Sequence, residues 1–228
     1  MLKLVVSDLD GTLMNGHNSL PDNVIEMIKN LRENGIFFAV ASGRKVCELG
    51  KIFEKVRNDV IFVACDGTFV MNNKEVLHKE VIDKKIIENT FGKSGVEAEY
   101  ISDFVGDTVK IVVKKSNLTP RIEEYIRINR SLSCVYEDNE IREYVKFGKN
   151  KGTALKELMR ILKIDKNDVV AFGDNINDIE MLKLIPKSYA MESGKPQIKR
   201  ICKYTTADVC QSVYHILENQ GGNLNGKV

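Results

Sequence analysis

The feature that most constrains this chain is a series of short apolar segments separated by amphipathic stretches. Each segment is too short for a helix, and near-continuous apolarity is typical of a parallel strand buried on both faces. The segments are Leu2–Val6, Ile36–Ala41, Val60–Ala64 and Val169–Phe172. The stretches between them show helical spacing of apolar residues. The sequence therefore predicts an α/β fold with a doubly wound (Rossmann-like) sheet of mostly parallel strands.

The sequence also predicts where two of the helices between these strands begin and end. The first is expected to begin at Ser19–Asp22, where Ser-x-x-Asp with an early proline is typical of a capping box, and to end at Gly35. The second is expected over about Val46–Val56.

Single strands no longer alternate with helices between residues 82 and 148. There, two helical segments alternate with two pairs of strands. Paired strands close together favour an antiparallel sheet with helices on one face. We therefore expect a core domain of residues 1–81 and 149–218, and an inserted α+β domain of residues 82–148. The tail, residues 219–228, is rich in glycine and asparagine and is expected to be disordered.

Polar residues that core packing does not explain follow the strands or begin the helices. They are Asp8, Asp10, Ser42, Arg44, Lys151, Asp174, Asn177 and Asp178. The carboxyl ends of strands in an open α/β sheet face one crevice, where such sheets bind their ligands. We therefore expect these side chains to converge on one site.

The residue types in this set indicate a particular chemistry. Carboxylates that share a crevice repel one another, which raises their pKa values unless a cation neutralises them. Oxygen ligands without histidine or cysteine favour a hard ion such as Mg²⁺. A serine hydroxyl, a lysine and glycine-flanked backbone amides suit a phosphoryl group. Together they indicate magnesium-assisted phosphoryl transfer.

Several of these residues also have a purely structural explanation. The Asp-Gly sequence at Asp10 is common in solvated turns, and Ser42 can form a turn with its own backbone. Asp178 can stabilise the start of a helix through the helix dipole. Lys151 can be a surface lysine at a helix start. For each residue taken alone, these alternatives stay open.

Four motifs occur in an order and spacing that match a known family. They are Asp8–Leu13, Ala41–Arg44, Asn150–Gly152 and Gly173–Leu182. In this order they resemble the haloacid dehalogenase superfamily of phosphatases, which form an aspartyl-phosphate. The insert between the second and third motifs resembles the α/β cap of the Cof-like branch. Its small size is similar to the compact caps of phosphoglycolate and sugar-phosphate phosphatases.

The resemblance implies a division of catalytic roles. Asp8 would be the nucleophile that attacks phosphorus. Asp10 would protonate the leaving alcohol and then activate the water that hydrolyses the intermediate. Ser42 and Lys151 would bind the phosphoryl oxygens.

The resemblance also implies a Mg²⁺ cofactor. Its ligands would be Asp8, Asp174, Asp178 and the backbone carbonyl of Asp10. Asn177 would help to orient this shell.

Further residues are expected to contact the substrate. They are Gly43, Arg44, Asp66 and Asn177. Asp66 departs from the family, which commonly has Asn-Gly at this position. A carboxylate there would disfavour a strongly anionic substrate or accept hydrogen bonds from sugar hydroxyls, and the alternative is a simple hairpin turn. Candidate contacts from the cap are Tyr100, Asp103, Lys110 and Arg142.

The expected function is Mg²⁺-dependent hydrolysis of a small phosphate monoester, either a sugar phosphate or a phosphoglycolate-like acid. A phosphomutase or phosphotransferase would use the same aspartyl-phosphate and pass the phosphoryl group to an alcohol. A non-catalytic protein that binds a phosphorylated ligand is the third possibility, but such a protein would not need Asp10.

The composition limits the partners and the compartment. The 34 basic and 32 acidic residues are interspersed, so no field of one sign indicates nucleic acid. No apolar run reaches the roughly 18 residues of a membrane span. The five cysteines form no C-x-x-C pair, so reduced thiols in the cytoplasm are expected. We expect a small phosphorylated metabolite as ligand, no nucleic-acid or membrane partner, and a monomer or homodimer.

Overall fold

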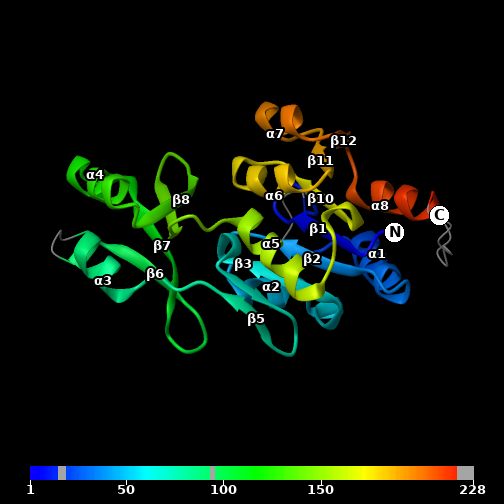
Figure 1. The fold of residues 1–228 in the computed structure, drawn as a ribbon, viewed down its shortest axis with the longest axis horizontal. Helices are drawn as coiled ribbons and strands as arrows, with labels where there is room; N and C mark the ends of the chain where they lie inside the picture. The colour runs from blue at the N-terminus through cyan, green and yellow to red at the C-terminus, as the bar shows by residue number, and fades with distance from the viewer. Residues whose placement is uncertain (15–18, 93–95, 220–228) are drawn as a thin grey trace.

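Two β-sheets organise the protein, as the computed structural model in Figure 1 shows for residues 1–14, 19–92 and 96–219. The larger sheet has the strand order β12-β11-β10-β1-β2-β3-β4-β5. The pairs from β12 to β3 are parallel, and β4 and β5 pair antiparallel. These strands are β1 (Leu4–Asp8), β2 (Phe37–Ala41), β3 (Val60–Ala64), β4 (Phe69–Met71), β5 (Val76–Lys79), β10 (Val169–Gly173), β11 (Lys187–Met191) and β12 (Tyr204–Thr206).

Helices cover both faces of the larger sheet. On one face lie α1 (Asp22–Glu33), α2 (Val46–Ile52) and α8 (Val209–Glu218), and on the other lie α5 (Lys151–Leu162), α6 (Ile179–Leu184) and α7 (Pro196–Ile201). Successive strand residues point to opposite faces, so Val5 packs with the first group and Val6 with the second. The doubly wound α/β fold predicted from the sequence is confirmed.

The central strand β1 explains why the opening segment is so apolar. It lies between β2 and β10, and all of its residues are buried. A strand covered on both faces and paired at both edges has no solvent-facing position, which removes the alternation of polar residues seen in half-exposed strands. Asp8 is the last residue of β1 and marks the end of this buried stretch.

The start of α1 differs from the predicted capping box at Ser19–Asp22. The helix begins at Asp22, Pro21 occupies the N-cap position, and no side chain there accepts a hydrogen bond from the backbone. Proline cannot provide a capping oxygen, but its fixed φ leads the chain into a helix without strain.

Two further elements differ from the sequence prediction. The helix expected over Val46–Val56 ends at Ile52, with Phe53 as its C-cap residue, and a 3₁₀ segment over Glu54–Asp59 follows. Within that segment the backbone of Val56 leaves the helical region at φ −134°. The edge strand β12 was not predicted, since its tyrosine and two threonines form no apolar run. The tail predicted to be disordered is residues 219–228. Asn219 is the C-cap residue of α8, and its amide donates to the carbonyl of His215, whereas residues 220–228 lie outside the described residues.

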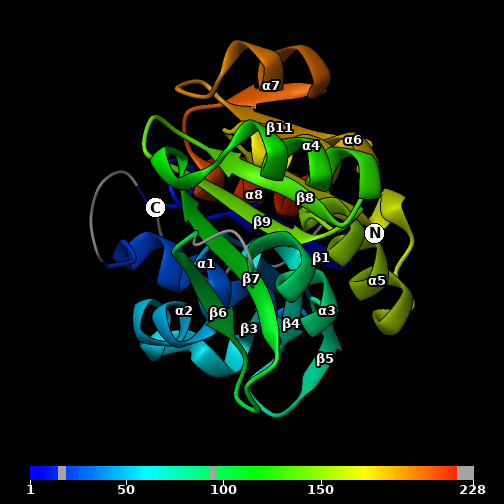
Figure 2. The ribbon, with the colours of Figure 1, turned by 90° about the vertical axis from the view of Figure 1, so that its left-hand side faces the viewer.

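The smaller sheet carries its own helices and core. Its strands are all antiparallel, in the order β6-β7-β9-β8. They are β6 (Ala98–Ser102), β7 (Thr108–Lys114), β8 (Leu132–Glu137) and β9 (Ile141–Lys146). One face packs against α3 (Lys84–Ile87), a π-helical turn (Glu88–Gly92) and α4 (Pro120–Asn129). Figures 1 and 2 show these helices on the side away from the larger sheet.

The other face of the smaller sheet lies toward the carboxyl ends of β1, β2 and β3. The chain crosses between the two sheets twice, after β5 and before α5. The division predicted at residues 82 and 148 falls within these crossings, because β5 ends at Lys79 and α5 begins at Lys151. We refer to residues 82–148 as the cap and to the remaining described residues as the core. In the described part of the chain, no helix is long and apolar enough to cross a membrane.

We expect Gly67→Ala to lower the free energy of unfolding by about 2–4 kcal/mol in urea denaturation. Gly67 has φ +95°, and an added Cβ would lie 2.4 Å from the carbonyl oxygen of Asn150 at the start of α5. The substitution therefore combines backbone strain with an overlap between two backbone segments that must meet.

Gly35→Ala is the matched control for this experiment. Gly35 also has a positive φ, +69°, but a Cβ there would meet nothing within 4 Å. We expect a loss of about 1 kcal/mol from strain alone. Equal losses at the two glycines would contradict the importance of the close approach between Gly67 and Asn150.

Candidate active site

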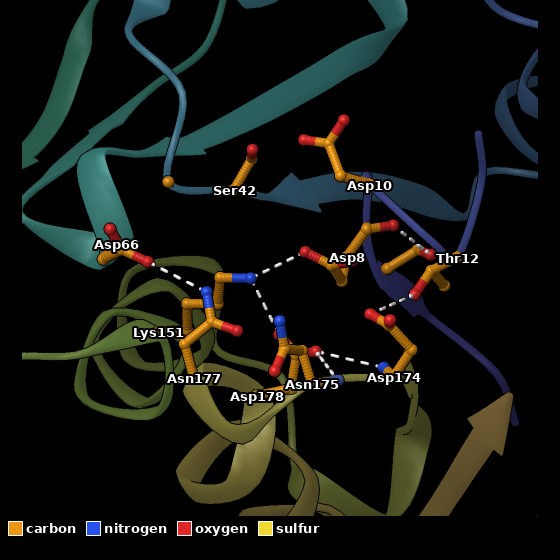
Figure 3. Close-up of polar contacts among 12 residues, drawn as sticks. Asp8, Asp10, Thr12, Ser42, Asp66, Lys151, Asp174, Asn175, Asn177 and Asp178 are labelled. Carbon is orange, nitrogen blue, oxygen red and sulfur yellow. Dashed lines mark hydrogen bonds and ion pairs between the residues drawn. The ribbon is translucent and has the colours of Figure 1, made fainter. Parts of the chain in front are cut away.

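The site begins at the carboxyl end of β1, where Asp8 meets Lys151 (Figure 3). Lys151 is the first residue of α5, and its Nζ lies 2.7 Å from Asp8 Oδ1 and 2.7 Å from Asp178 Oδ1. The preceding Asn150 accepts a hydrogen bond from the Thr153 amide, which fixes the start of the helix. Lys151 is buried, so the alternative of a surface lysine is wrong.

Asp174 and Asp178 come from the segment that joins β10 to α6. Asp178 is buried, and its Oδ2 accepts hydrogen bonds from the amides of Asp174 at 3.1 Å and Asn175 at 3.0 Å. Asp178 thus does stabilise the turn that leads into α6, as its structural alternative proposed. Its other oxygen faces Lys151, so the same carboxylate is also part of the site.

The electrostatics of the cluster are unfavourable for three anions. Asp8, Asp174 and Asp178 each offer a carboxylate oxygen, and these atoms lie within 4.8 Å of one another. Burial, together with repulsion from Asp178, raises the pKa of Asp8 to about 8, although Lys151 opposes the shift. Burial and Asp178 also raise the pKa of Asp174. One lysine does not neutralise three carboxylates, so the site favours a further cation.

The donor set fits a hard divalent cation. Asp8 Oδ2 is buried and has no hydrogen-bond partner among the described residues, and a buried anionic oxygen is costly unless a cation binds it. All of the donors are oxygen atoms, as Mg²⁺ prefers. Gly11 lets Asp174 come close to the loop after β1, since a Cβ at Gly11 would lie 2.5 Å from Asp174 Oδ2. The backbone carbonyl of Asp10 as a further ligand stays a prediction.

Asp10 lies beside the cluster and pairs with Arg44. Its carboxylate accepts two hydrogen bonds from the guanidinium, at 2.8 Å from Nε and 2.6 Å from Nη2. The Asp10 side chain is 51% exposed, in contrast to the buried Asp8. Asp10 is therefore accessible to a ligand, and Arg44 restricts its orientation through a bidentate bond.

Ser42 is the first residue of the loop after β2 and is buried at the edge of the site. Its Oγ accepts a hydrogen bond from the Arg44 amide at 3.2 Å, which is the turn that the structural alternative described. The hydroxyl proton is not used in that bond. The carbonyl of Gly43 accepts a hydrogen bond from Lys110 of the cap at 3.0 Å.

Asp66 lies in the connection between β3 and β4, in the left-handed region at φ +54°. Its side chain is buried rather than solvated, and both oxygens are engaged. Oδ2 accepts from Lys110 Nζ at 2.8 Å, and Oδ1 accepts from Asn177 Nδ2 at 3.1 Å. The Asn177 amide thus contacts Asp66, and its expected role in orienting the metal carboxylates stays a prediction.

A cavity of about 450 Å³ lies between the core and the cap. The core residues that line it are Asp8, Asp10, Ser42, Gly43, Arg44, Lys45, Glu48, Asp66, Asp174, Asn175 and Asn177, and the cap residues are Ile101, Lys110, Tyr136 and Glu143. Almost all of the residues predicted for the site therefore border one cavity. Lys151 and Asp178 do not line it and lie behind Asp8.

Of the four cap contacts predicted from the sequence, Lys110 alone lines the cavity. Asp103 forms an ion pair with Lys79, and Arg142 pairs with Glu137 at the outer part of the sheet. Tyr100 is 41% exposed and lies outside the cavity.

Glu143 and Tyr136 were missed as cap contacts. The two residues are cross-strand partners. Period-two alternation could have placed them on the same face as Lys110, but only if the pairing of β7 with β9 had been known.

A comparison with models of protein families places this chain in one of them. The model of haloacid dehalogenase-like hydrolases matches residues 5–94 and 93–217. The chain belongs to this family. The predicted resemblance to its Cof-like phosphatases is confirmed, and the protein is an enzyme of the phosphatase class.

Named relatives cover nearly the whole chain. The 5-amino-6-(5-phospho-D-ribitylamino)uracil phosphatase YbjI of Escherichia coli (strain K12) is 24% identical over 89% of this chain and 90% of its own length. The phosphatase YcsE of Bacillus subtilis (strain 168), which carries the same activity name, is 24% identical over 90% of each chain. The solved structure of the subclass IIB sugar phosphatase BT4131 matches with a TM-score of 0.74 and 18% identity, over 96% of this chain and 99% of that one.

We expect Lys151→Met to lower the free energy of unfolding by about 3–5 kcal/mol without added metal, because it leaves buried carboxylates without their counter-charge. Urea denaturation at neutral pH measures the change. Lys156→Met is the matched control, since Lys156 is an exposed lysine of the same helix and should change stability by less than about 0.5 kcal/mol. Similar losses in both variants would show that Lys151 does not balance the buried charges.

Proposed function

We propose that the protein hydrolyses a small phosphate monoester in a Mg²⁺-dependent reaction through an aspartyl-phosphate on Asp8. The observation that carries the proposal is the state of Asp8. It is a buried carboxylate at the end of β1, beside a cavity that reaches the cap. Lys151 holds its Oδ1, and its Oδ2 has no hydrogen-bond partner in the part of the chain that the structure describes. A positioned carboxylate next to a cation-binding cluster suits in-line attack on phosphorus.

The residues around Asp8 have distinct roles in this proposal. Asp8 attacks phosphorus, and the bond to the leaving alcohol breaks as the phosphoryl group is transferred. Asp10 donates a proton to that alcohol and then takes one from the water that cleaves the acyl-phosphate. Lys151 holds Asp8 and balances its charge, and the Ser42 hydroxyl donates to a phosphoryl oxygen.

Asp8, Asp174 and Asp178 would hold the metal, with the Asp10 carbonyl as a further ligand. When bound, Mg²⁺ would neutralise charge between the carboxylates and the phosphoryl oxygens. The unpartnered Asp8 Oδ2 and the mutual repulsion of the cluster support this assignment.

The substrate class is proposed from the cavity and the relatives. A cavity of about 450 Å³ suits a small phosphorylated metabolite. Two relatives are named for a phosphorylated ribityl compound and one structural neighbour is named a sugar phosphatase. We propose a sugar or polyol phosphate handled in the cytoplasm by a monomer or homodimer, without a nucleic-acid or membrane partner.

Asp10 favours an enzyme over a non-catalytic binding protein, and the fate of the phosphoryl group separates hydrolysis from transfer. A protein that only bound a phosphorylated ligand would not need an accessible carboxylate next to the nucleophile. A phosphotransferase would use the same pair but would exclude water, so added acceptor alcohols would divert the phosphoryl group. We expect release of inorganic phosphate to dominate in the presence of such alcohols.

We expect Asp8→Asn to lower kcat/KM by on the order of 10³-fold or more, because an amide is a poor nucleophile. Release of inorganic phosphate from a panel of sugar and polyol phosphates measures the effect. Asp10→Asn should slow the breakdown of the intermediate, so that intact mass spectrometry detects phosphorylated protein. Asp22→Asn, at an exposed residue of α1, should match the wild type. Unchanged turnover in Asp8→Asn would contradict the nucleophile.

We expect Mg²⁺ to stabilise the folded protein by about 2.7 kcal/mol at one hundred times its Kd. Thermal or urea denaturation with and without Mg²⁺ measures this without any substrate. Asp174→Asn should lose most of the effect, and the exposed Asp22→Asn should keep it. A shift of equal size in both variants would place the metal elsewhere.

A further inference from the structure

The cavity wall opposite the phosphoryl site is built by one residue from each strand of the cap sheet. They are Ile101, Lys110, Tyr136 and Glu143. Ile101 pairs with Lys110, and Tyr136 pairs with Glu143, so all four lie on the face turned toward the core. In the proposed function, which this inference extends, the leaving group of the substrate would contact this wall.

The hydrogen-bonding capacity of Lys110 is fully used. An ammonium group has three donors, and Lys110 Nζ has three acceptors: the Gly43 carbonyl at 3.0 Å, Asp66 Oδ2 at 2.8 Å and Glu143 Oε2. Its side chain is 2% exposed. Burial would lower its pKa, but Asp66 and Glu143 outweigh burial and raise it. Lys110 is therefore a fixed charge that holds Glu143, and it has no donor left for a ligand.

The other cations that line the cavity are also paired. Arg44 forms its bidentate bond with Asp10, and Lys45 Nζ lies 2.8 Å from Glu99. An anionic leaving group near Arg44 or Lys45 would therefore share each cation with the carboxylate that already neutralises it. Among the described residues, Lys110 is the cation of this wall, and Asp66 and Glu143 both pair with it.

Glu143 is the wall residue with a free acceptor. Lys110 engages its Oε2, and Oε1 has no hydrogen bond or ion pair within the described residues. The side chain is 18% exposed, and it borders the cavity. Both oxygens of Asp66 are already engaged by Lys110 and Asn177. Among the cap residues that line the cavity, Glu143 is thus the carboxylate available to a leaving group.

We propose that Glu143 is a specificity-determining residue that accepts a hydrogen bond from a hydroxyl of the leaving group and excludes leaving groups that carry a carboxylate. Lys110 acts as the positioning residue that holds Glu143 in place. The substrates are then phosphate esters of uncharged polyols or sugars, and phosphorylated hydroxy acids are rejected. A like charge brought against a partly buried carboxylate is strongly unfavourable, whereas a hydroxyl is a good partner for it.

The experiment compares glycerol phosphate with phosphoglycerate, which differ by a hydroxymethyl group against a carboxylate. For the wild type we expect kcat/KM to be at least about tenfold higher for glycerol phosphate, mainly through KM. Glu143→Gln keeps the size of the side chain and an acceptor for Lys110 but removes the charge. We expect this variant to raise kcat/KM for phosphoglycerate, so that the preference for glycerol phosphate falls by about tenfold.

Glu140→Gln is the matched control. Glu140 is an exposed glutamate in the turn between β8 and β9, so the variant makes the same charge change in the same sheet but outside the cavity. It should keep the wild-type preference. Acetyl phosphate, whose leaving group makes few contacts, reports on the phosphoryl chemistry alone.

The outcomes separate this inference from the proposed function. A wild type that hydrolyses phosphoglycerate as well as glycerol phosphate overturns the inference and leaves the phosphatase intact. An unchanged preference in Glu143→Gln, or the same change in Glu140→Gln, also overturns it. Hydrolysis of acetyl phosphate without hydrolysis of glycerol phosphate would also overturn the inference, and it would leave the phosphatase activity intact. Failure to hydrolyse any of the three overturns the proposed function, and the inference with it.

Discussion

The structure of the site depends on one buried ammonium group. Lys151 Nζ lies 2.7 Å from both Asp8 and Asp178, so it joins the end of β1, the start of α5 and the turn before α6. Burying these carboxylates without a counter-charge would cost several kcal/mol per ion. The doubly wound sheet makes the contact possible, because it brings together residues that are 143 positions apart in sequence.

Lys110 repeats this arrangement at the other end of the cavity. It too is a buried lysine between two carboxylates, but it extends from the cap and reaches Asp66 and Gly43 in the core. In the proposed function, the cavity has a phosphoryl end built by the core, in front of Lys151, and a leaving-group end where Lys110 joins cap and core. Chemistry and selectivity would then be carried by different parts of the chain.

The extent to which the sequence predicts this site follows from the same division. Asp8, Ser42 and Asp174 were predictable because each follows a strand whose burial is evident locally, and parallel strands end at one edge. The contact of Lys110 with Glu143 was not, because it depends on strand pairing within the cap and on how the cap faces the core. Local signals also misled where a neighbour decided the structure, as at β12, which is a strand through its pairing with β11.

The contact between Lys110 and Asp66 has a consequence for how such enzymes can change. Each residue is buried, and each neutralises the other across the boundary between cap and core. Replacing Lys110 alone would leave Asp66 as a buried charge without its counter-ion, at a cost of about 3–5 kcal/mol. Replacing Asp66 alone would leave Lys110 paired with Glu143. A cap transplanted from a relative that lacks this lysine would therefore also need a neutral residue at position 66.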